Sequence, residues 1–111
     1  MSLFADMRPL LPPSGAPLSR VGYQGKAWIG DVLPLRSDAF ERYPLLSGID
    51  PYGYTVFNSV QMPFVVAELE RRQGEFAGAP EGSRDAEFIA ELLAFARECE
   101  CSHKALFFIG D

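Results

Sequence analysis

The strongest hydrophobic pattern of the chain lies between residues 83 and 103. Apolar side chains recur there at the spacing of one helix face: Phe88, Ile89, Leu92, Leu93, Phe95, Ala96 and Cys99. Ser83 stands directly before this stripe, where a side-chain oxygen can accept the free N–H groups of a helix start. Asp85 and Glu87 follow in the first turn, where negative charge suits the helix dipole. The pattern predicts a helix that ends near residues 101–103.

A second, shorter helix is predicted over residues 62–73. Its apolar face is made by Met62, Val65, Val66, Leu69 and Phe76. The opposite face, which we expect to be solvated, holds Glu68, Glu70, Arg71 and Arg72. Pro63 lies near the start of this helix, where a missing N–H group costs little.

Three segments have the character of strands. Residues 104–109 are almost continuously apolar, which is typical of a strand buried on both faces. Residues 52–57 and 27–29 are shorter and are bounded by turn residues. The sequence therefore predicts an α+β fold with a small antiparallel or mixed sheet of about three strands and two helices packed on one face.

A sharp corner is predicted between residues 46 and 58. Asp50, Pro51 and Gly53 favour a bend, because proline presets φ and an Asp side chain can bond its own backbone two residues ahead. The aromatic and β-branched residues 54–57 then indicate a short strand. Asn58 or Ser59 can accept N–H groups of the following helix.

Length and composition indicate one domain over residues 1–111. The chain has 111 residues, of which 48% are hydrophobic, and this is enough apolar mass for a packed core. We expect residues 1–22 to form an irregular proline-rich arm, because Pro9, Pro12, Pro13 and Pro17 lie close together.

Charge and cysteine content argue against several classes of protein. The net charge of −5 and scattered basic residues disfavour nucleic-acid binding. No apolar run reaches the length of a membrane span, and the N-terminus does not have the pattern of a secretion signal. Cys99 and Cys101, the two cysteines, are too close for an unstrained disulfide. A cytoplasmic setting is therefore expected.

Metal binding, cofactor binding and nucleophilic catalysis are not favoured by the residue pattern. Cys99, Cys101 and His103 are zinc-type ligands, but spacings of two residues do not converge on one side of a helix. His103 is the sole histidine and thus the only imidazole base for a nucleophile. The sequence accordingly assigns no catalytic residue, no metal ligand and no cofactor.

Loop carboxylates and aromatic residues leave two kinds of site open. Carboxylates that could meet in a cleft as an acid/base pair are Asp31, Asp38, Glu41, Asp50 and Asp111. Aromatic side chains in loops or short strands are Tyr23, Trp28, Tyr43, Tyr52 and Tyr54, and such residues are enriched at protein-binding hot spots. The candidate partner-binding residues are Asp50, Tyr52 and Tyr54. The alternative is that the aromatic residues simply complete a small core.

Two segments of the chain resemble a family of small uncharacterised bacterial proteins. The core motif reads Ile49-Asp50-Pro51-Tyr52-Gly53-x-Thr55-x-Phe57-Asn58, and the other segment ends in Phe108-Ile109-Gly110-Asp111. The resemblance covers roughly residues 45–72 and 103–111, and Tyr54 stands where the family often has a polar residue. It implies no activity, so no catalytic residue is transferred. Members look like the small acidic proteins associated with toxin neutralisation, which is an analogy of type only.

Three functional hypotheses follow. The first is a non-catalytic protein-binding protein, immunity-like or regulatory, with a basic protein as its partner. The second is a small enzyme or ligand-binding domain that uses at least two of Asp31, Asp50 and Asp111 in a pocket near Trp28. The third is a self-associating structural module, since the mean hydropathy of +0.01 is high for so acidic a chain.

Overall fold

The computed structural model of the chain describes residues 2–8, 20–24, 32–35, 39–50, 52–80 and 82–110. Its strands are β1 (Ser2–Arg8), β2 (Arg20–Gln24), β3 (Tyr54–Phe57) and β4 (Ala105–Gly110). Its helices are a 3-10 turn, η3 (Leu46–Gly48), and two α-helices, α1 (Met62–Glu75) and α2 (Arg84–Ser102).

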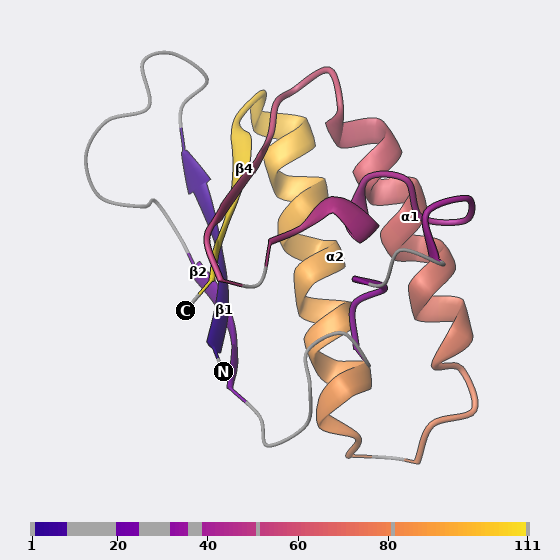
Figure 1. Cartoon of the computed structure of the whole chain (residues 1–111). Coiled ribbons are helices and arrows are strands. Elements are labelled where there is room, and N and C mark those ends of the chain that lie inside the picture. The colour runs from indigo at the N-terminus through magenta and orange to yellow at the C-terminus, as the bar shows by residue number, and fades with distance from the viewer. Residues whose placement is uncertain are drawn as a thin grey trace.

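The four strands form one antiparallel sheet in the order β2-β1-β4-β3. Figure 1 shows both α-helices on the same side of this sheet, with α2 next to the strands and α1 packed against α2. The predicted α+β class and the packing of both helices on one face are confirmed, while the sheet has four strands instead of about three. The strand expected at residues 27–29 lies outside the described residues.

Strands β1 and β2 correct the expectation of an irregular arm over residues 1–22. Ser2–Arg8 pairs with β4, where Ala5 lies opposite Phe108, and Arg20–Gln24 pairs with β1. The four prolines lie between the two strands, in residues 9–19, which the structure does not describe. Composition could not reveal β1, because its pairing with β4 joins segments about a hundred residues apart.

The helix ends follow from local chemistry. Ser83 Oγ accepts the N–H of Ala86 over 3.3 Å, which confirms the predicted cap of α2. The helix ends at Ser102, and His103 closes it in the left-handed region at φ 55°. At α1 the prediction is partly wrong. Asn58 Oδ1 accepts the N–H groups of Val60 and Gln61, so this side chain holds the turn before the helix and not the helix itself.

The core lies between the sheet and the helices and also includes a long connection. Residues 105–108 of β4 are all buried, as predicted, and Phe108 packs edge-to-face on Phe57 with ring centres 5.9 Å apart. The connection before β3 adds buried apolar side chains at Val32, Leu33, Tyr43, Leu46 and Ile49. Residues 32–35 and 39–50 have little regular structure, yet they supply part of the core.

Candidate functional site

The corner before β3 is held by hydrogen bonds among its own residues. Asp50 Oδ1 accepts the N–H of Tyr52 over 2.9 Å, and the Asp50 carbonyl accepts the N–H of Gly53 over 3.4 Å. The N–H of Asp50 donates to Thr55 Oγ1 over 2.8 Å. This is the self-bonded turn that the sequence predicts for an Asp followed by Pro and Gly. We call residues 50 and 52–55 the corner.

The corner presents its two tyrosines to solvent. Tyr52 is 67% exposed and Tyr54 is 72% exposed, while Asp50 is also an exposed residue. Strand alternation places Val56 on the Tyr54 side and turns Phe57, which is 5% exposed, into the core. Tyr52 lies in the turn before β3, so strand alternation does not set its direction. The three predicted site residues therefore lie close together in the chain and are all accessible. Whether they bind a partner stays a prediction.

Polar side chains on α1 form a second cluster. It corrects the expected solvated face at Glu68, which is buried, whereas Glu70 and Arg71 are exposed as predicted and Arg72 is half-buried. Glu68, Arg71, Arg72 and Glu75 follow one another at the spacing of a single helix stripe. Glu68 is only 6% exposed, and its carboxylate accepts the N–H groups of Leu45 and Leu46. We call these four residues the polar clasp, because they bind residues 32–35 and 39–49 of the connection.

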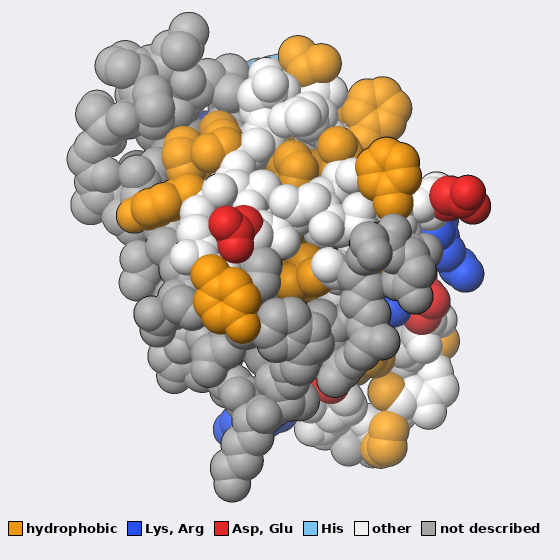
Figure 2. Space-filling view, viewed as in Figure 1, with side chains coloured by type: hydrophobic (Ala, Val, Ile, Leu, Met, Phe, Trp, Pro, Cys, Tyr) orange, Lys and Arg blue, Asp and Glu red, His pale blue; other side chains and the backbone are white. Residues whose placement is uncertain are grey.

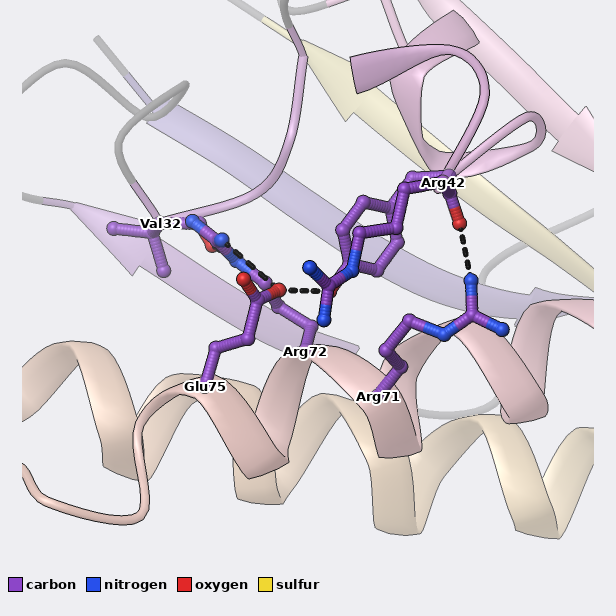
Figure 3. Close-up of polar contacts among 6 residues, drawn as sticks. Val32, Arg42, Arg71, Arg72 and Glu75 are labelled. Carbon is purple, nitrogen blue, oxygen red and sulfur yellow. Dashed lines mark hydrogen bonds and ion pairs between the residues drawn. The ribbon is translucent and has the colours of Figure 1, made fainter.

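Figure 3 shows the exposed end of the polar clasp. Arg71 donates to the carbonyl of Arg42 over 2.6 Å, and Arg72 donates to the carbonyl of Val32 over 2.7 Å. Arg72 also forms an ion pair of 3.4 Å with Glu75. Both arginines donate to main-chain carbonyl groups, so these two contacts position the backbone of the connection and do not depend on the identity of its side chains.

Tyr43 is buried, so this loop aromatic completes the core and is not part of an exposed aromatic surface. Only 2% of the residue is exposed. Its hydroxyl donates to the carboxylate of Glu75, and the guanidinium groups of Arg42 and Arg71 lie 5.9 and 6.0 Å from its ring centre. Tyr43 thus joins the connection to α1.

The two cysteines have different environments at the end of α2. Cys99 is fully buried, and Cys101 is exposed. Burial, together with the neighbouring charge of Glu98, raises the pKa of the Cys99 thiol to about 12, so the thiol stays protonated and weakly nucleophilic at neutral pH. In the described part of the chain, no three His, Cys, Asp or Glu side chains gather as a metal site would require.

The carboxylate pocket of the second hypothesis stays a prediction. Asp50 is the one member of its acid set that the structure describes, since Asp31, Asp111 and the nearby Trp28 lie outside the described residues. Of the other loop carboxylates, Glu41 is an exposed residue of the connection and Asp38 is not described.

Comparison with known proteins finds no relative of this chain. Neither the models of protein families, nor the curated proteins, nor the solved structures give a match to this chain. The family resemblance of the corner motif therefore stays an expectation. Among the helices that the structure describes, none is long and apolar enough to span a membrane.

Proposed function

We propose that this chain is a non-catalytic protein that binds a basic protein partner through Asp50, Tyr52 and Tyr54, as an immunity or regulatory protein would. The observation that carries the proposal is the exposure of both tyrosines on a corner that its own hydrogen bonds hold in place. Tyrosine is among the residues that dominate binding energy at interfaces.

Rigidity favours binding at this corner. The backbone N–H groups of Asp50, Tyr52 and Gly53 all donate hydrogen bonds within the corner. The corner continues directly into β3. A surface that is ordered before binding loses less conformational entropy on association, so more of the contact energy is retained as affinity. The net charge of −5 and the exposed Asp50 favour encounter with a positively charged protein.

Capture followed by affinity measurement tests the proposal. The tagged chain is used to isolate a partner from its own host, and the partner is then purified and titrated against variants by calorimetry. Alanine at Tyr52 or Tyr54 should weaken binding at least about tenfold, the effect of truncating a hot-spot aromatic. Alanine at Asp50 should slow association, most clearly at low salt.

Phe40→Ala is the matched control, because Phe40 is 62% exposed but lies outside the corner. Circular dichroism melting of every variant establishes that the fold is kept. If Tyr52→Ala and Tyr54→Ala bind the partner as tightly as the Phe40→Ala control does, the corner is not the binding site.

A further inference from the structure

The segment that contains the corner is almost free of charge. Asp50 is the one charged residue within residues 44–67, although Lys, Arg, Asp and Glu make up 23% of the whole chain. The segment runs through η3, the corner, β3 and the first turns of α1. Buried segments are often uncharged, so what matters here is which of its side chains reach the solvent.

Several apolar side chains of this segment are exposed. Six large hydrophobic side chains are exposed in the described part of the chain, and five belong to this segment: Tyr52, Tyr54, Val56, Val60 and Phe64. Val60 is 77% exposed and Phe64 is 64% exposed, so both are about as open to solvent as the tyrosines of the corner. We call these five side chains, with Asp50, the apolar surface.

Figure 2 shows how hydrophobic side chains are distributed on the face in front of β4. They are spread across that face with an acidic side chain among them, while blue basic groups lie toward its margins. Interface centres are characterised by this combination of enriched aromatic residues and depleted charge. A fully solvated surface would instead carry mixed charges.

We propose that the apolar surface binds a partner segment that is itself apolar and carries a single Lys or Arg, which pairs with Asp50. This inference rests on the proposed function and extends it from three residues to six. Asp50 Oδ1 already accepts the N–H of Tyr52, and a carboxylate has further lone pairs for a charged donor. The ion pairs among the described residues use Glu70 and Glu75, and leave Asp50 available.

At the contact itself, charge complementarity selects a segment with one cation over a segment with many, whatever the overall charge of the protein that carries the segment. Each additional positive charge within the contacting segment would face Tyr, Val or Phe side chains and would lose hydration without gaining a carboxylate. One cation matches the one anion of the surface, and apolar side chains of the partner match the rest. The complex should therefore depend only weakly on salt, because salt screens a single charge pair in it.

Peptide selection tests the proposal even while the natural partner is unidentified. A phage-displayed library of random peptides is selected on the full chain, and synthetic copies of the enriched peptides are titrated by calorimetry. The enriched sequences should be apolar, with one Lys or Arg. Asp50→Asn should weaken their binding about tenfold or more, as expected for a hydrogen bond to a charged group. Val60→Ser and Phe64→Ser should each weaken it severalfold, whereas Glu91→Gln on the exposed face of α2 should not change it.

Several results would overturn the proposal. These are enriched peptides with many basic residues, binding that Asp50→Asn leaves unchanged, and failure of the library to yield any binder. Sedimentation velocity that shows a dimer which Phe64→Ser dissociates would assign the surface to a second copy of the chain. If the captured partner is lost on Tyr52→Ala but binds Val60→Ser and Phe64→Ser normally, the proposed function stands and this extension is wrong.

Discussion

The buried carboxylate of Glu68 accepts the backbone N–H of Leu46 over 3.0 Å, and this bond joins the middle of α1 to the start of η3. The Leu46 carbonyl in turn accepts the N–H of Ile49, and the next residue, Asp50, begins the corner. A short series of hydrogen bonds therefore links α1 to the segment that carries the exposed tyrosines. Glu68 therefore positions the backbone of η3, from which the chain passes out of the core into the corner.

Replacement of Glu68 by Gln should destabilise the protein. The amide keeps one acceptor oxygen, but it loses the charge and places an N–H₂ group beside two backbone donors. We expect a loss of about 2 kcal/mol in the free energy of unfolding, the usual scale for hydrogen bonds to a charged, buried group. Urea unfolding followed by circular dichroism measures this loss.

Glu70→Gln is the control for that experiment. Glu70 is two residues away on the same helix, its side chain is 53% exposed, and it forms a surface ion pair of 3.2 Å with Arg97. Its loss should cost less than about 1 kcal/mol. Equal losses in the two variants would show that the Glu68 contacts contribute no more than a surface charge does.

Gly53→Ala should disturb the corner. A Cβ atom at this position would lie 2.6 Å from Asp50 Oδ2, so the carboxylate would have to move and its bond to the Tyr52 N–H would weaken. We expect a loss of about 1 kcal/mol, the lower end of the range for overpacking, because the exposed carboxylate of Asp50 can move aside. Amide hydrogen exchange at Tyr52 should also accelerate. Gly48→Ala, where the added Cβ meets nothing within 4 Å, should leave both measurements nearly unchanged.

The raised pKa of Cys99 predicts a pH dependence of stability. The folded protein holds the thiol proton up to about pH 12, whereas the ordinary pKa is 9.0. Above pH 9.0 the unfolded chain is stabilised because its Cys99 thiol releases this proton. The contribution of Cys99 to the free energy of unfolding is therefore complete below pH 9.0 and is lost as the pH rises above it. Between about pH 8 and about pH 10 the wild type should lose about 1 kcal/mol more than Cys99→Ala does.

Thiol labelling provides an independent measurement of the same difference. A colorimetric thiol reagent should modify Cys101 in the folded protein at neutral pH, and Cys99 only after unfolding. Cys101→Ala should therefore remove nearly all labelling of the folded protein. Rapid labelling of this variant would contradict the burial of Cys99.

His103→Gly should stabilise the end of α2. His103 has φ 55° and ψ 44°, a left-handed conformation that costs roughly 1 kcal/mol for a residue with a Cβ and little for glycine. The gain should be at most about 0.5 kcal/mol, because the greater flexibility of glycine in the unfolded chain offsets at least half of the relieved strain. Thermal melting measures it, and His103→Val should shift the melting temperature in the opposite direction.

The elements that depend on contacts between neighbouring residues could be predicted from local sequence patterns. The stripe from Phe88 to Cys99, the cap at Ser83 and the strand over residues 54–57 depend on neighbours within a few positions. The bend at Asp50 belongs to the same class, because its acceptor and donors lie within five residues.

Features that depend on distant partners could not be predicted. Glu68 stands in a run of charged residues and has the pattern of a solvated position, but its donors lie 22 and 23 residues earlier in the chain. Tyr43 is buried for the same reason, since its hydroxyl meets Glu75 on α1. Strand β1 is ordered through its ladder with β4, which no local composition encodes.

Strand β4 comes last of the four in sequence, yet it occupies the middle of the sheet between β1 and β3. During synthesis, β1 and β3 can emerge from the ribosome only with this neighbour still missing, and the ladder from Leu3 to Gly110 must wait for it. Emergence of β4 then allows β1 and β3 to join one sheet at once. Assembly of the sheet should therefore be an all-or-none event that waits for β4, and it should be slow because the ladder joins distant segments.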